Sequence, residues 1–254
     1  MRELISNVLN REAEAIRELV FSLDEAQVDA VTETIKNCRG KVVLSACGTS
    51  AQAARKIAHT LCCVGCPAFF IPPSDALHGG LGVIGEQDVL LLLSKGGYTK
   101  EINEMILPAR RSGARVIMVT ENEEGEYAKS CDLILRIKVK EEPDRFNMLA
   151  TASTLAVIAV FDAVSISLME EKQFTKEHFY RIHPGGGVGK RGSCHRVLRR
   201  RRRAGSGGGM RRAAIPARKA GHGQPDLVCR CGRRTGRDEL WLLPARGDGL
   251  CSGR

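Results

Sequence analysis

Two short segments rich in glycine and hydroxyl side chains each stand between an apolar run and a helix-forming stretch. Residues 46–50 read Ala-Cys-Gly-Thr-Ser, and residues 94–99 read Ser-Lys-Gly-Gly-Tyr-Thr. Glycines let backbone N–H groups approach a phosphate, hydroxyls donate hydrogen bonds to it, and a helix N-terminus favours its negative charge. Either segment alone is also ordinary turn and cap chemistry. Together they favour a ligand that carries a phosphate.

Nucleotide-binding fingerprints are missing from both segments. Neither contains the Gly-Lys-Ser/Thr of a P-loop, and no Gly-x-Gly-x-x-Gly stands between an expected strand and an expected helix. ATP and NAD are therefore poor candidates for the ligand.

Four ionisable residues stand where they could act on a ligand, and each also has a structural interpretation. His183 precedes a glycine-rich run at an expected helix end, where a histidine is often a cap, and His78 lies in Leu-His-Gly-Gly, where it could cap a loop. Glu101 starts an expected helix and could simply favour the helix dipole. Glu142 precedes a proline and could be a solvated loop charge. These alternatives stay open on the residues alone.

The elements that must position these residues form an α/β pattern. Short apolar runs alternate with helical stretches, which is typical of parallel strands buried on both faces. We therefore predict a five-stranded parallel sheet between helices. The expected strands are residues 41–46, 68–71, 88–94, 115–120 and 133–139.

Helical periodicity predicts the remaining elements. An apolar face recurs along residues 1–22, and a second helix is expected from Asp24, as its N-cap, to about Asn37. Further helices are expected at 51–61 and 100–111. A long helix of small residues is expected from about Asn147 to Glu170, followed by a short one capped by Thr175. The glutamates at 121–126 are expected to face solvent.

The charge divides the chain in two. The formal net charge is +10, but residues 191–254 hold 17 basic and 4 acidic residues, whereas residues 1–190 hold 22 basic and 25 acidic residues. The basic segment is rich in Arg and Gly and is expected to be disordered. It is interpreted either as an arm that binds nucleic acid or, the reading we favour, as the product of a shifted reading frame.

Composition also bounds the compartment and the cofactors. The longest apolar runs are too short to span a bilayer, and the N-terminus has no signal-peptide pattern, so neither secretion nor membrane insertion is expected. Ten cysteines are too dilute for a disulfide scaffold, which favours the cytoplasm. Cys63 and Cys66 form one CxxC without a second, so buried thiols are expected rather than a metal site.

The order of four motifs resembles the sugar isomerase (SIS) domain, over about residues 1–190. The motifs are CGTSAQAARKIA, SDALHGGLG, SKGGYTKEI and IHPGGGVGK, at residues 47–58, 74–82, 94–102 and 182–190. The second and fourth are most similar to the arabinose-5-phosphate isomerase branch, of KpsF/GutQ type. The resemblance implies a three-layer sandwich, a homotetramer and interconversion of ribulose 5-phosphate and arabinose 5-phosphate without a cofactor. Many members of the branch carry a pair of CBS domains, which this chain lacks.

Site roles follow from the same resemblance. Isomerisation needs a base that moves a proton between carbons 2 and 1 through an enediol, and an acid–base group for the oxygens and ring opening. The resemblance places catalysis at His183, Glu142, Glu101 and His78, and phosphate binding at Gly48, Thr49, Ser50, Ser94, Gly97 and Thr99.

Two departures from the branch affect this assignment. The first loop has Thr49 where a lysine is usual, and the second has Tyr98 where a glutamate is usual. Lys95 is expected to return the lost positive charge to the phosphate. The alternative function is a binding module that senses a sugar phosphate without turning it over; the acidic balance of residues 1–40 opposes a DNA-binding role.

Overall fold

The computed structural model describes residues 1–185 and contains one parallel sheet within them. Its strands follow the order β2-β1-β3-β4-β5, and every neighbouring pair is parallel. All five expected strands are confirmed; β4 has the predicted bounds, and the other four are shorter than their apolar runs. Their bounds are β1 Val42–Ala46, β2 Ala68–Phe70, β3 Val89–Leu93, β4 Arg115–Thr120 and β5 Leu133–Arg136.

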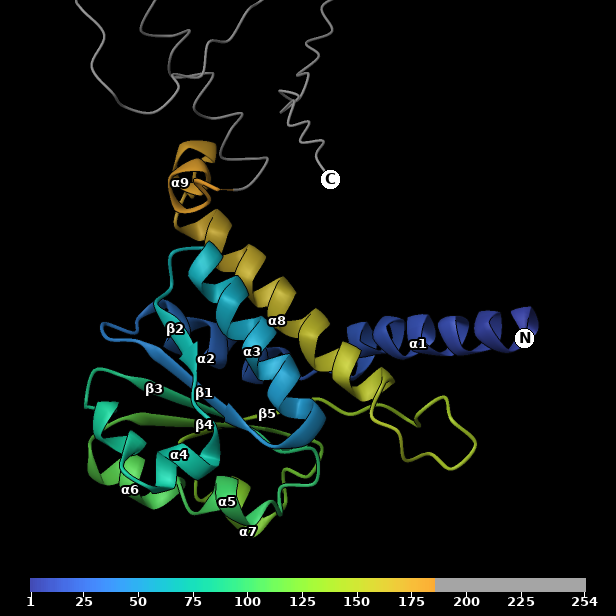
Figure 1. Ribbon diagram of the computed structural model, residues 1–254, viewed down its shortest axis with the longest axis horizontal. Helices are drawn as coiled ribbons and strands as arrows, with labels where there is room; N and C mark the ends of the chain where they lie inside the picture. The colour runs from blue at the N-terminus through green and yellow to red at the C-terminus, as the bar shows by residue number, and fades with distance from the viewer. Residues whose placement is uncertain (186–254) are drawn as a thin grey trace, which may run out of the picture. The chain divides into compact units, whose positions relative to one another are not determined.

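Helices cover both faces of the sheet, which confirms the three-layer α/β sandwich (Figure 1). One face carries α1 Arg2–Ser22, α2 Glu25–Lys36, α3 Gly48–Cys63 and α8 Ala152–Glu171. The other carries α4 Pro73–Leu77, the 3-10 turn Gly80–Val83, α5 Lys100–Asn103, α6 Ile106–Arg111 and α7 Glu126–Lys129, and α9 Lys176–Ile182 follows α8.

The central strands are buried on both faces because their alternate residues enter two different cores. Along β3, Leu91 packs with Leu44, Ile57 and Phe161, whereas Leu90 packs with Ile102 under the opposite helices. Successive side chains of a strand point to opposite faces. This explains why β3 appears as a continuous apolar run rather than an alternating one.

Two predicted helices are present, but the start of one and the continuity of the other are wrong. The helix expected from Asn147 begins only at Ala152, because Asn147 has φ +56° and the Asp144 carboxylate accepts N–H groups of the loop before it. The helix expected over 100–111 is broken between Asn103 and Ile106. Pro108 has no backbone N–H to donate. Because α6 begins at Ile106, Pro108 lies in the first turn of that helix, where the N–H groups have no partner within the helix.

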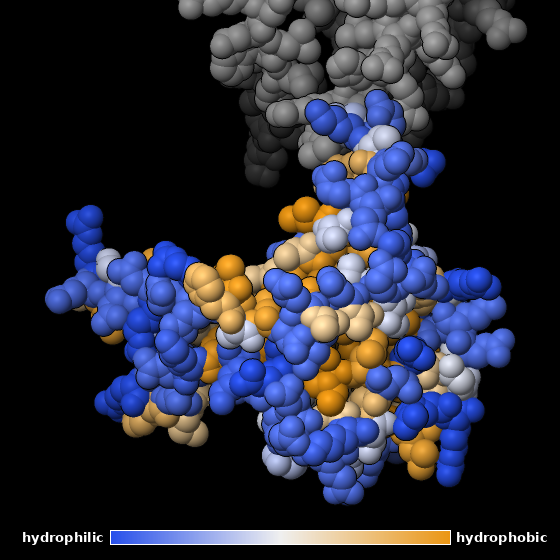
Figure 2. Space-filling view, turned by 180° about the vertical axis from the view of Figure 1, so that it is seen from behind, coloured by the Kyte–Doolittle hydropathy of each residue, from blue (hydrophilic) through white to orange (hydrophobic). Residues whose placement is uncertain are grey.

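Helix α1 extends away from the sheet and leaves most of its apolar face uncovered (Figure 1). Leu19 is buried, but Leu4, Ile5 and Leu9 are each more than half exposed. Figure 2 shows apolar surface between this helix and the body of the domain. Arg11 ties the helix to the loop after β5 by donating to the carbonyls of Glu142 and Pro143.

Helix α8 is long and apolar enough, by length and composition, to cross a membrane. Its contacts identify it as a core helix instead. Phe161 and Leu168 are buried against the sheet and α3, and Asp162 forms an ion pair with Lys56.

The basic segment predicted at 191–254 lies outside the described residues.

Candidate functional site

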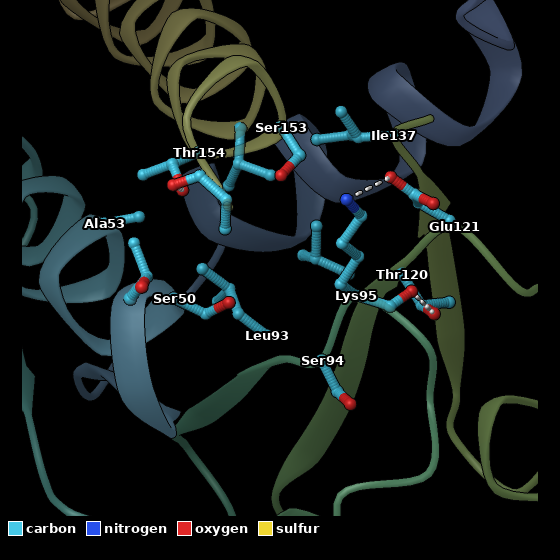
Figure 3. Close-up of a pocket in the computed structure, with 14 residues that line it drawn as sticks. Ser50, Ala53, Leu93, Ser94, Lys95, Thr120, Glu121, Ile137, Ser153 and Thr154 are labelled. Carbon is cyan, nitrogen blue, oxygen red and sulfur yellow. Dashed lines mark hydrogen bonds and ion pairs between the residues drawn. The ribbon is translucent and has the colours of Figure 1, made fainter. Parts of the chain in front are cut away.

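The site lies at the carboxyl ends of the strands, where the topology changes direction. The chain leaves β1 toward β2 on one side and returns to β3 on the other, and ligands of open parallel sheets bind at such a switch point. A cavity of about 180 Å³ opens here (Figure 3). Its lining comes from α3, the ends of β3 and β4, the segment after β5 and the start of α8, through Thr49, Ser50, Ala53, Leu93, Ser94, Lys95, Val119, Thr120, Glu121, Ile137, Ala150, Ser153, Thr154 and Val157.

One end of the cavity is rich in hydroxyls. Gly48 takes φ +58°, which lets α3 begin directly after β1, and Thr49 and Ser50 line the cavity from the first turn of the helix. No described side chain caps this 16-residue helix, so its first N–H groups are available to an anion.

The second predicted loop supplies side chains and shape. Ser94 lines the cavity, and its Oγ lies 3.0 Å from Thr99 Oγ1. Gly97 has φ +77°, and its carbonyl accepts a hydrogen bond from the buried Asn103 amide. Ser94 and Lys95 therefore reach the cavity, while Gly97 and Thr99 shape the loop beside it.

The opposite end of the cavity is charged. Lys95 extends from the end of β3, and its Nζ donates to Glu142 Oε1 at 2.7 Å and lies 3.8 Å from Glu121 Oε1. In Figure 3, Lys95 points toward Glu121, while Ser153 and Thr154 approach from α8. The Lys95 ammonium thus lies inside the cavity, and its contact with a phosphate stays a prediction.

Glu142 is no solvated loop charge, since it is only 1% exposed. Its carboxylate accepts hydrogen bonds from the Thr151 and Ser153 N–H groups, from Ser153 Oγ and from Lys95. Burial alone would raise its pKa, but Lys95 and Ser153 outweigh burial and the pKa is lowered. The side chain is therefore an ionised carboxylate that fixes Lys95 and the start of α8.

Sequence reasoning missed Glu121 and wrongly placed it among solvent-facing glutamates. Its side chain is 21% exposed and lines the cavity. Burial raises its pKa, and nearby Lys95 opposes that shift. Glu121 directly follows β4, so the rule that ligands bind at the carboxyl ends of parallel strands was the signal that could have found it. Thr120, Ser153 and Thr154 also line the cavity unforeseen.

His78 and Glu101 are not part of the cavity lining. His78 is exposed as the C-cap of α4, and Glu101 is exposed in the first turn of α5. Both follow strands at the same edge of the sheet as the cavity, and α4 packs against α5. Their catalytic roles stay predictions.

The structure places His183 at the far end of α3. Its Nε2 lies 3.4 Å from Cys63 Sγ, its Nδ1 lies 3.0 Å from the Phe179 carbonyl, and its ring stacks on Phe179. Gly48 starts α3 and Cys63 ends it, and these 16 residues span about 24 Å at about 1.5 Å per residue. Within one chain His183 does not join the cavity.

Cys63 and Cys66 form no disulfide, and Cys66 is buried. Within residues 1–185, no three ligating side chains gather into a site that could hold a metal ion.

Comparison with known proteins gives one family over the whole described sheet. The SIS domain model matches residues 34–167. The arabinose 5-phosphate isomerase KpsF of Escherichia coli is 36% identical over 187 residues, which is 74% of this chain and 57% of KpsF. The chain thus spans little more than half the length of this curated relative.

Two solved structures share the fold over nearly their whole length. A Listeria monocytogenes protein is 46% identical, with a TM-score of 0.71 over 72% of this chain and 96% of that one. An Escherichia coli protein in complex with arabinose 5-phosphate is 34% identical, with a TM-score of 0.69 and the same coverage.

Proposed function

Because the chain belongs to the SIS domain family, we propose that it interconverts the aldose and ketose forms of a sugar phosphate. The substrate pair proposed is arabinose 5-phosphate and ribulose 5-phosphate, as the name of KpsF and the complexed relative suggest. One observation carries the proposal: the cavity joins an uncapped helix N-terminus rich in hydroxyls to a lysine held between two carboxylates.

Phosphate binding belongs to the hydroxyl end of the cavity. Thr49 and Ser50 offer hydroxyl and backbone donors at the start of α3, and Ser94 lines the same cavity after β3. Gly48, Gly97 and Thr99 give these two loops the shape that brings their donors to one anion. Lys95, at the charged end, supplies the positive charge that the first loop lacks at Thr49.

The charged end serves the isomerisation itself. An enediol intermediate develops negative charge on oxygen, which the Lys95 ammonium can stabilise without reorganisation. We propose Glu142 as an acid–base group and as the residue that positions this ammonium. Glu101 and His78 act from the open side of the same edge. Only protons move in this reaction, so the proposal requires no metal or organic cofactor.

His183 is proposed to serve the cavity of a second copy of the chain. It lies about the length of α3 from the cavity of its own chain, so an intramolecular role would require its helix to detach. The uncovered apolar face of α1, with Leu4, Ile5 and Leu9, is a suitable surface for such an assembly. We propose a homotetramer that works in the cytoplasm.

Isotope exchange tests the proposed reaction. The full chain is mixed with ribulose 5-phosphate in heavy water and followed by proton NMR. We expect deuterium to enter carbon 1 and signals of the aldose to appear. Binding of the sugar phosphate without exchange would instead support the alternative function, a sensor that binds a sugar phosphate without converting it. Two observations favour the sensor: the Glu142 carboxylate is already fully hydrogen-bonded, and a threonine stands at position 49.

A further inference from the structure

One carboxylate in the cavity is not used by the chemistry above. Glu121 follows β4, and its backbone N–H donates to the Lys95 carbonyl at 2.9 Å, which fixes it beside Lys95. Its Oε1 is buried and accepts no hydrogen bond from the described residues. Lys95 Nζ, at 3.8 Å, is too far to donate to it. A buried acceptor without a donor costs free energy.

Neutralising Lys95 does not explain this carboxylate. The Lys95 ammonium already donates to Glu142 at 2.7 Å, and Glu142 is fixed by three further donors from Thr151 and Ser153. The ion pair is therefore complete without Glu121. Glu121 therefore leaves this end of the cavity with an acceptor that no described residue satisfies.

The position of Glu121 also orients the ligand. A carboxylate repels a phosphate, so the phosphate belongs at the other end, beside Thr49 and Ser50 at the start of α3. The part of the ligand that reaches Glu121 must be uncharged and must donate a hydrogen bond. Sugar hydroxyls have both properties.

We propose that Glu121 Oε1 accepts a hydrogen bond from a hydroxyl of the bound sugar phosphate and makes that hydroxyl a condition of tight binding. The inference rests on the proposed function, since it takes the ligand to be a sugar phosphate. A site built to bind a hydroxyl rejects ligands that lack it, because the buried acceptor is then left without a partner. Because of Glu121, the cavity should bind sugar phosphates more tightly than phosphates that carry no hydroxyl group.

Calorimetric titration of the full chain with two probes tests the proposal. Arabinose 5-phosphate fills both ends of the cavity, whereas inorganic phosphate fills only the hydroxyl end. We expect Glu121→Ala to weaken binding of arabinose 5-phosphate by about 10- to 100-fold and to leave phosphate binding unchanged or tighter. Glu121→Gln keeps an oxygen acceptor and should retain most of the affinity. Glu126→Gln, on the exposed start of α7, is the matched control and should bind like the unmodified chain.

Each other outcome overturns the proposal. If Glu121→Ala weakens both probes equally, the residue acts through Lys95 or the fold and not on a hydroxyl. If neither affinity changes, or if the unmodified chain binds arabinose 5-phosphate no more tightly than phosphate, Glu121 recognises no sugar hydroxyl. The proposed reaction fails separately, through absent isotope exchange, and the two affinities still decide the role of Glu121.

Discussion

At the scale of single residues, two carboxylates with opposite pKa shifts lie beside Lys95. Glu142 has several donors and its pKa is lowered, whereas Glu121 has a buried oxygen without a donor and its pKa is raised. Lys95 donates a hydrogen bond to Glu142 at 2.7 Å but lies 3.8 Å from Glu121, so the hydrogen bonds that each carboxylate accepts, the one from Lys95 included, separate their pKa values. The pair resembles in principle the acid–base assignments of enzymes whose neighbouring carboxylates differ in environment.

The opposite shifts predict opposite effects of pH on stability. The pKa of Glu142 is lowered from its ordinary value of 4.5, so ionised Glu142 adds stability to the folded chain above pH 4.5. This stability is lost as the pH falls through the pKa that Glu142 has in the folded chain. Glu142→Gln should therefore be less stable than the unmodified chain near pH 7, with a smaller gap near pH 4. Glu121→Gln should be more stable near pH 7, by about 1 kcal/mol, because a raised pKa costs stability as the pH rises. Denaturant unfolding at both pH values measures this; gaps of the same sign would contradict it.

Lys95 gives a second prediction at this scale. Lys95→Met removes the cation but keeps the length of the side chain. We expect sugar-phosphate affinity to fall by about tenfold or more, since a charge-assisted contact contributes about 1.5–3 kcal/mol. Stability should fall by about 1 kcal/mol, because Glu142 keeps its donors from Thr151 and Ser153. Titration and thermal unfolding test both, with the exposed Lys100→Met as control. An unchanged affinity would refute the compensating role of Lys95.

At the scale of elements, caps and glycines decide where helices begin. Asp24 accepts a hydrogen bond from Gln27 N–H, and Thr175 forms a capping box with His178, so both predicted caps are confirmed. Helix α3 begins without a side-chain cap, which leaves its N–H groups to a ligand. The start of α8 is satisfied instead by Glu142, a residue ten positions before the helix.

The Asp24 cap provides a prediction for an element. Asp24→Ala should lower the stability of the domain by about 1 kcal/mol, because the first turn of α2 loses its acceptor. Asp29→Ala, at an exposed position in the middle of the same helix, is the control and should change stability by less than about 0.5 kcal/mol. Thermal unfolding compares the two; equal losses would show that the cap contributes nothing specific.

At the scale of the whole molecule, the described domain leaves His183 and the cavity apart. If His183 serves a second copy, a site needs residues from two chains. Mixing Glu142→Ala with His183→Ala, each inactive alone, should then restore part of the isomerase activity, because some mixed sites receive both intact residues. Co-expression of two differently tagged variants, followed by an activity assay of the mixed assembly, tests this. No recovery in an assembly that contains both variants would assign His183 to its own chain or to no site.

Sequence alone determined the layers of the fold and the hydroxyl end of the site. Continuous apolar runs such as Val89–Leu93 require burial on both faces, and local turn chemistry at Gly48 and Gly97 is encoded within a few residues. The parallel order then brings the ends of β1 and β3 together. These features depend on neighbours in the chain or on strand pairing, which residue patterns express directly.

Tertiary structure decided the charged end of the site. Packing between β4, the segment after β5 and the start of α8 decides whether Glu121 faces solvent and whether Glu142 is a loop charge. The local sequence around these two residues does not reveal that packing. The position of His183 beside Cys63 likewise brings together the end of α9 and the end of α3, which lie 120 residues apart in the sequence. The physical reason is that burial, and with it pKa and hydrogen bonding, is set by contacts between residues far apart in the sequence.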